Sequence, residues 1–141
     1  MADAGPRIIV EDGIAYLYDR TRSKFLGTRA YLRYGASGRS VSDQFLKVED
    51  GQPTMSVGDM LPRKGTIVGI TANTEIVGTW EVEVYKKDTA LPIANLVINS
   101  LSKLSDTNYN VDIDSGDIIM VKAKGSDIHL PRVIIEVSWR V

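Results

Sequence analysis

The sequence contains no cysteine and only one histidine, His129. Without cysteine the chain can form no disulfide, no zinc–thiolate site and no thiol nucleophile. A single histidine leaves little from which to build a catalytic triad, or the His/Glu metal cluster that a cupin-type enzyme needs. His129 precedes Pro131 in an expected loop, where a surface position is the favoured interpretation. We therefore expect no catalytic residues, no cofactor and no metal, and a protein that is not an enzyme.

The sequence also lacks a charge surplus and a long apolar run. Its formal net charge is −1, which gives no global electrostatic attraction to nucleic acid or to an anionic membrane. No apolar run reaches the ~18 residues of a membrane span, and residues 1–6 lack the basic and then apolar pattern of a secretory signal. The 141 residues are enough for one domain with a substantial core. We expect neither a nucleic-acid nor a membrane partner.

Alternation with a period of two dominates the end of the chain. From residue 132 onward, every second residue is apolar: Val133, Ile135, Val137, Trp139 and Val141. This pattern is typical of a half-buried strand, and it predicts that the chain ends in a core position. The run at 117–124 predicts another strand just before it. Ile134, on the supposedly outer side, suggests that this sheet is partly covered, as do Tyr85 and either Ile119 or Met120.

Four further strands are predicted from residue 63 onward, at 66–71, 80–86, 92–98 and 108–114. In the second of them, Trp80, Val82 and Val84 should face inward. Turn-forming residues separate the runs. No segment combines apolar residues at the helical period of 3.6 with helix-capping residues at its ends. Short strands at regular spacing predict an all-β antiparallel sandwich, jelly roll or barrel.

The first part of the chain is less regular. Short strands are predicted at 8–10, 14–18, 24–26 and 30–34, with a turn at Glu11–Gly13 between the first two. Residues 35–40 and 51–62 have loop or turn composition, and residues 43–48 could form a strand or a helical turn. We therefore divide the chain into an N-terminal region of short strands, 1–62, which could pack on the core, and a core at 63–141.

Two groups of carboxylates are candidate sites. Asp112, Asp114 and Asp117 superficially resemble a calcium loop, but a strand followed by a turn with Gly116 at positive φ is favoured. Glu81 and Glu83 share one face of a strand and could do acid–base work. A solvated face is the favoured interpretation for that pair.

Basic and aromatic residues interleave between residues 20 and 34. Arginine and tyrosine are enriched at protein interfaces, and basic residues among aromatics can also bind nucleic acid. An ordinary polar face of short strands remains the simpler alternative. If the stretch is functional, a protein interface is favoured, made by Arg22, Lys24, Tyr31, Arg33 and Tyr34.

Three pieces of sequence carry a resemblance to a known class. A strand follows the Pro-Arg-x-Gly turn at 62–65, a Trp-x-Val-x-Val strand at 80–84 ends in Lys-Lys, and a Ser-Gly-Asp turn at 115–117 precedes the closing strands. This pattern resembles the C-terminal jelly roll of the tumour-necrosis-factor and C1q-like class. It is similar in that sense to trimeric jelly-roll decoration (cement) proteins and fibre heads of tailed bacteriophages.

The resemblance covers roughly residues 60–141 and implies an antiparallel jelly-roll sandwich with an N-terminal extension, packed as a homotrimer. It implies a structural protein of the virion that is assembled in the host cytoplasm, binds the major capsid protein and stabilises the phage head. The alternative is a receptor- or carbohydrate-binding head of a phage fibre, or a lectin-like module, in which aromatic loops would stack on sugars.

Overall fold

The computed structural model describes residues 7–36, 40–48 and 58–141, and these residues form an all-β, antiparallel fold. The predicted loop at 35–40 and turn at 51–62 lie partly outside the described residues, and residues 1–6 lie wholly outside them. The strands are β1 (Ile8–Glu11), β2 (Ile14–Asp19), β3 (Lys24–Gly35), β4 (Gln44–Phe45), β5 (Lys47–Val48), β6 (Asp59–Met60), β7 (Gly65–Lys86), β8 (Ala94–Asp106), β9 (Val111–Ile113), β10 (Ile118–Lys124) and β11 (Arg132–Arg140).

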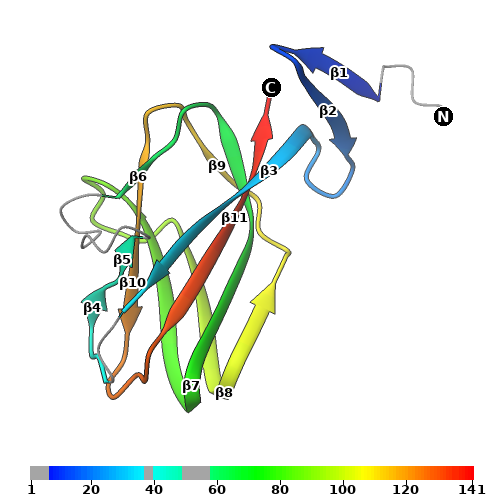
Figure 1. Cartoon of the computed structure of the whole chain (residues 1–141). Helices are drawn as coiled ribbons and strands as arrows, with labels where there is room; N and C mark the ends of the chain where they lie inside the picture. Colours follow the sequence, from blue (N-terminus) through cyan, green and yellow to red (C-terminus); the bar gives the residue numbers. More distant parts are fainter. Residues whose placement is uncertain (1–6, 37–39, 49–57) are drawn as a thin grey trace.

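One curled sheet contains all eleven of these strands, in the central order β1-β2-β3-β11-β7-β10-β4. β7 makes the curl, because it turns back at the lower end of the molecule in Figure 1. Its first half, from Gly65 to Asn73, pairs with β11, and its second half, from Glu81 to Lys86, pairs with β10. β8 follows the bend and pairs with both halves. The result is a sandwich-like arrangement, as the alternation of short apolar runs predicts.

The core lies inside the curl and takes side chains from both halves of the sheet. Ile67 and Ile70 come from the first half of β7, and Val82 and Val84 come from the second half. β10 and β11 add fully buried residues such as Val121 and Ile135. The predicted inward positions of β11 are confirmed for Val133, Ile135 and Val137. Trp80, Val82 and Val84 are buried in the same way.

Several sequence-based expectations were wrong in detail. The predicted strands at 66–71 and 80–86 are parts of the single long β7, because residues 72–79 contain no proline to end the strand, although its pairing with β8 is irregular between Asn73 and Trp80. The strands predicted at 24–26 and 30–34 are likewise one strand, β3. β9 covers only Val111–Ile113 of the predicted 108–114. Val141 lies beyond β11 and is 43% exposed, so the chain does not end in the core.

The structure of residues 43–48 and the directions of Ile119 and Met120 could each be read in two ways from the sequence. Residues 43–48 form two short strands, β4 and β5, and no helical turn. Of the pair Ile119 and Met120, Ile119 joins the core cluster. Met120 lies opposite Tyr85 on the outer side and is nevertheless only 8% exposed. Part of that outer side is thus covered within the chain itself.

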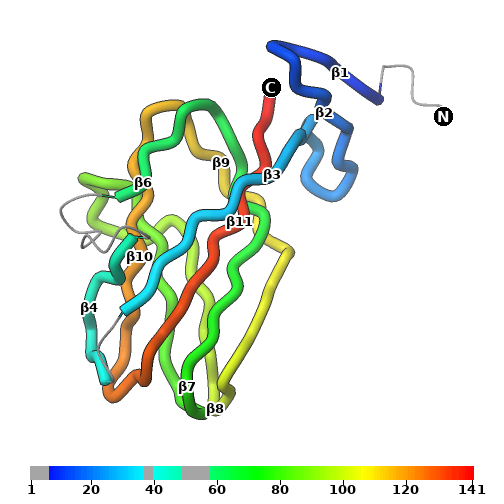
Figure 2. The backbone as a smooth tube through the Cα atoms, in the orientation of Figure 1, coloured from blue at the N-terminus to red at the C-terminus, as the bar shows by residue number. Residues whose placement is uncertain are grey.

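The N-terminal strands continue the same sheet. β3 pairs with β11 from Arg132↔Gly35 to Arg140↔Leu26, with an irregularity near the end of β11. β2 pairs with the start of β3, and β1 pairs with β2. The β1–β2 hairpin stands away from the rest of the sheet, as the tube in Figure 2 shows. The predicted turn at Glu11–Gly13 is confirmed, with both Asp12 (φ 51°) and Gly13 (φ 77°) at positive φ, as a type I′ hairpin turn requires.

Candidate interaction face

The outer side of β3 and β11 presents basic and aromatic side chains together. Residues of β3 that point inward, such as Tyr34, alternate with residues that point outward. In the register of the two strands, Arg33 lies opposite Ile134 and Tyr31 lies opposite Glu136. We call this surface the β3–β11 face and define it by Arg29, Tyr31 and Arg33 of β3 and Arg132, Ile134 and Glu136 of β11.

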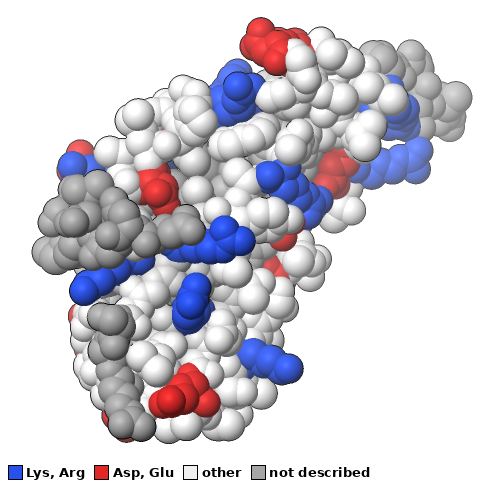
Figure 3. Space-filling model, viewed as in Figure 1, with Lys and Arg blue, Asp and Glu red and all other residues white. Residues whose placement is uncertain are grey.

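The arginine and tyrosine side chains of this face are exposed to solvent. Tyr31 is 52% exposed, and Arg33 and Arg132 are also exposed. Ile134 lies between them and is half-buried. Arg29 forms an ion pair with Glu136, the one acidic residue of the face as defined. Figure 3 shows Lys and Arg side chains spread over the surface that β3 and β11 occupy, with fewer acidic ones. The face is therefore locally basic on a chain whose formal net charge is −1.

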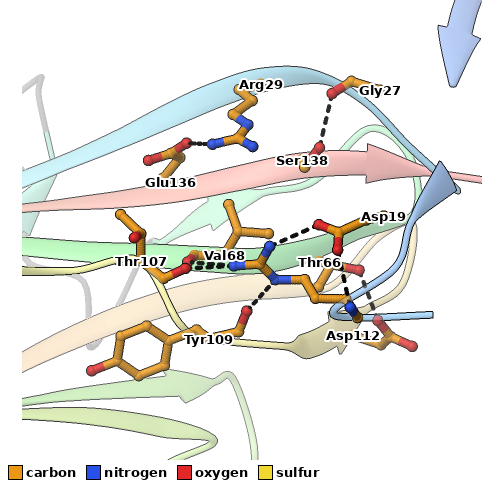
Figure 4. A network of polar contacts seen from close by, with 11 residues as sticks. Asp19, Gly27, Arg29, Thr66, Val68, Thr107, Tyr109, Asp112, Glu136 and Ser138 are labelled. Atoms are coloured by element: carbon orange, nitrogen blue, oxygen red, sulfur yellow. Dashed lines mark hydrogen bonds and ion pairs between the residues drawn. The ribbon is translucent and has the colours of Figure 1, made fainter. Parts of the chain in front are cut away.

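Arg22 has a different environment, because it lies in the turn between β2 and β3 and points into the molecule. Its Nε donates to the carbonyl of Tyr109 (2.6 Å), and its Nη2 donates to the carbonyls of Val68 and Thr107. Its Nη1 forms an ion pair with Asp19 (2.8 Å). Figure 4 draws these contacts, which we call the Arg22 clamp. The clamp ties the β2–β3 turn to β7 and to the β8–β9 loop, and the Arg22 side chain is only 13% exposed.

A second polar network lies close to the clamp and is centred on Asp112. The Asp112 carboxylate accepts hydrogen bonds from Lys24 (2.6 Å) and Thr66 (2.7 Å), and Arg140 lies 3.6 Å away. Burial raises the pKa of Asp112, but these hydrogen bonds and the charges of Arg140 and Lys24 outweigh it, so the pKa lies below its ordinary value. Lys24 thus links the start of β3 to β9.

The five residues predicted as an interface are therefore not brought together in one place. Tyr31 and Arg33 lie on the β3–β11 face, whereas Arg22 and Lys24 take part in contacts within the chain. Tyr34 is 2% exposed and its hydroxyl donates to the carbonyl of Ile119. Burial, together with the nearby Asp59, raises the pKa of Tyr34 far above its ordinary value. Arg29 lies in the basic and aromatic stretch but was not among the five predicted residues, and Arg132 was not predicted. Ile134 was expected on a partly covered side of the sheet but was not assigned to the interface.

The two candidate carboxylate groups are held by hydrogen bonds within the chain. Gly116 adopts φ 87° and the backbone N–H of Asp114 is bonded to Asp117, which confirms the favoured turn. In the ranges that the structure describes, no group of three or more His, Asp or Glu residues could hold a metal ion. Glu83 is 8% exposed, so the expectation of a solvated Glu81/Glu83 face was wrong. The Tyr85 hydroxyl donates a hydrogen bond to the Glu83 carboxylate (3.0 Å).

His129 is partly exposed, with its side chain 23% accessible, and its Nε2 lies 3.2 Å from Asp127. The Asp127 carboxylate also accepts a hydrogen bond from Ser40 (2.6 Å), and this bond and the neighbouring His129 hold the pKa of Asp127 below its ordinary value. This contact joins the β10–β11 loop to Ser40, just before the bridge between Val41 and Ile128. Ser40, Asp127 and His129 therefore hold the β10–β11 loop in place.

Comparisons with known proteins give no relative from which to transfer a function. No family model, no curated protein and no solved structure matches the chain. The residues that the structure describes contain no helix long and apolar enough to cross a membrane.

Proposed function

We propose that this chain is a structural binding protein of the virion: a decoration protein that binds the head lattice of a tailed bacteriophage through the β3–β11 face. The observation that carries the proposal is the exposed Tyr31 beside Arg33, Arg132 and the half-buried Ile134 on one sheet surface. Aromatic and arginine side chains around a small apolar centre are typical of protein interfaces. The resemblance of residues 60–141 to phage decoration proteins points to the head lattice, and by the same resemblance the binding unit would be a homotrimer.

The mechanism requires binding alone. Tyr31 and Ile134 would lose their contact with water against an acidic patch of the major capsid protein, and Arg33 and Arg132 would pair with carboxylates there. Such pairs set the register and the association rate more than the affinity. Each bound copy would add cohesion to the lattice against the pressure of packaged DNA.

Co-sedimentation with purified phage heads tests the proposal. We expect the native chain to sediment with heads, and Arg33→Glu and Tyr31→Ala to weaken binding by about tenfold or more, as hot-spot residues do. Lys87→Glu is the matched control, because it makes the same charge reversal in the exposed turn after β7. Full binding by Arg33→Glu, or equal losses for both charge reversals, would count against this face.

The carbohydrate-binding alternative has one observation in its favour. An open cavity of about 240 Å³ beside the Arg22 clamp is lined by polar residues: Asp19, Thr21, Arg22, Thr107, Asn108 and Asn110. Trp80, in contrast, is 4% exposed and cannot stack on a sugar. Binding to a glycan array that is lost on Asn108→Ala, with head binding absent, would favour this alternative.

A further inference from the structure

The β1 strand forms an open edge at one end of the sheet. Among the described residues, β1 pairs with β2 alone and ends the strand order. Figures 1 and 2 show the β1–β2 hairpin standing away from the rest of the sheet. Its outer residues are strongly exposed, with Ile8 at 57%, Val10 at 68% and Leu17 at 59%. An open strand edge with exposed apolar side chains is a template for pairing with another strand.

The hydrogen-bonding alternation of the hairpin decides which groups are available on that edge. The N–H of Tyr18 donates to the carbonyl of Arg7, so these two residues are a hydrogen-bonded pair. Pairs in an antiparallel ladder alternate between bonded and non-bonded. In the register of β1 and β2, Ile9 and Glu11 therefore direct their main-chain groups toward β2. Ile8 and Val10 direct theirs toward the open edge.

A second copy of the same strand fits this edge in one particular register. We propose that two copies of this chain pair β1 to β1 in antiparallel orientation, about a two-fold axis at Ile9. In this register Ile8 of each copy lies opposite Val10 of the other, and these are the two residues whose main-chain groups point toward the open edge. Their apolar side chains lie on the same face and shield each other across the junction.

Charge complementarity selects this register over its neighbours. The Arg7 guanidinium lies over the Tyr18 ring of its own hairpin, 5.3 Å from the ring centre. With Ile9 opposite Ile9, each Arg7 keeps this contact and also lies opposite Glu11 of the other copy, which places two oppositely charged pairs at the junction. A shift by two residues in either direction keeps the hydrogen-bonding pattern but breaks both charge pairs. The sequence Arg7-Ile-Ile-Val-Glu11 is thus self-complementary in charge, apolar face and main-chain pattern. The junction does not involve the β3–β11 face, so it does not depend on attachment to phage heads through that face. It is a two-fold contact between two chains and is distinct from the three-fold packing that the resemblance implies.

Disulfide trapping tests the register directly, because the chain has no cysteine of its own. Ile9→Cys places two thiols opposite each other in a non-hydrogen-bonded pair with Cα atoms about 4.5 Å apart, within the range that a disulfide spans. We expect mild oxidation to yield a covalent dimer on a non-reducing gel. Val97→Cys is the control, since it lies at a 56% exposed position of β8. Absence of the Ile9→Cys dimer, or equal yields from both variants, would overturn the proposal.

A charge exchange keeps the test decisive even if cysteine at position 9 disturbs the hairpin. Arg7→Glu and Glu11→Arg each create like-charged pairs in their own homodimers and should weaken self-association by about tenfold. Mixing the two variants restores both opposite-charge pairs, so native mass spectrometry should show a heterodimer. If the mixture associates no better than either variant alone, the two-fold junction is wrong. Head binding by the Arg7→Glu variant should be retained, which separates this junction from the proposed function.

Discussion

Removal of the Arg22 clamp should loosen the N-terminal strands without unfolding the core. In Arg22→Ala the carbonyls of Val68, Thr107 and Tyr109 lose the hydrogen bonds from the guanidinium, although the Val68 carbonyl still accepts from the Tyr109 N–H, and Asp19 loses its ion-pair partner. A hydrogen bond to a charged group contributes roughly 1.5–3 kcal/mol when both partners are shielded. The open cavity beside the clamp lets water replace part of this loss. We therefore expect a net destabilisation of about 2–3 kcal/mol.

Urea unfolding of Arg22→Ala, compared with Arg63→Ala, measures this cost. Arg63 is exposed just before β7, and its loss should change the free energy of unfolding by less than about 0.5 kcal/mol. Arg22→Lys should recover less than half of the loss, because one ammonium group cannot reproduce the planar fork that reaches several carbonyls. Amide exchange should accelerate first in β2 and the start of β3. Equal stability of Arg22→Ala and Arg63→Ala would refute the role of the clamp.

Three further perturbations follow from other parts of the structure. The pKa of Asp112 is lower in the folded state than its ordinary value of 3.8. The stabilisation that its carboxylate contributes is therefore complete above that value and is lost as the pH falls through the lower folded-state pKa. In acid titrations below about pH 4, Asp112→Asn should lose less stability than the native chain. Ile135→Ala should cost about 2–5 kcal/mol in thermal unfolding because Ile135 is fully buried, and a similar cost for the half-buried Ile134→Ala would contradict the assigned faces. Gly116→Ala should lower the free energy of unfolding by about 1 kcal/mol, because Gly116 has a φ of 87°. Gly78 has open space around it and no positive φ, so Gly78→Ala should lower the free energy of unfolding by less.

Alternation along the chain was sufficient to predict the fold class and the core strands. Val133, Ile135 and Val137 are inward because residues of one parity share a sheet face. The Asp-Gly turn after β1 and the Gly116 turn were also predictable, since positive φ leaves few residue choices. Strand lengths could not be predicted in the same way. The residues at the bend of β7 have the composition of a turn, but the strand continues through them.

The residues of the β3–β11 face could be predicted only in part, because the sequence of the N-terminal stretch does not show which way each side chain points. A run of basic and aromatic residues shows composition but not direction, so Tyr34, which is buried, and Tyr31, which is exposed, look alike in the sequence. Arg22 resembles an interface arginine until its long-range partners at Val68, Thr107 and Tyr109 are known. Those partners are brought close only by the tertiary fold.

The identity of the binding face is tested most directly by side-chain footprinting of the protein free and bound to phage heads. Hydroxyl radicals should modify both Tyr31 and Met60 in the free protein, because they are 52% and 66% exposed. We predict that bound heads protect Tyr31 strongly and leave Met60 reactive. Unchanged oxidation of Tyr31 in the bound protein would contradict the β3–β11 face as the site of attachment.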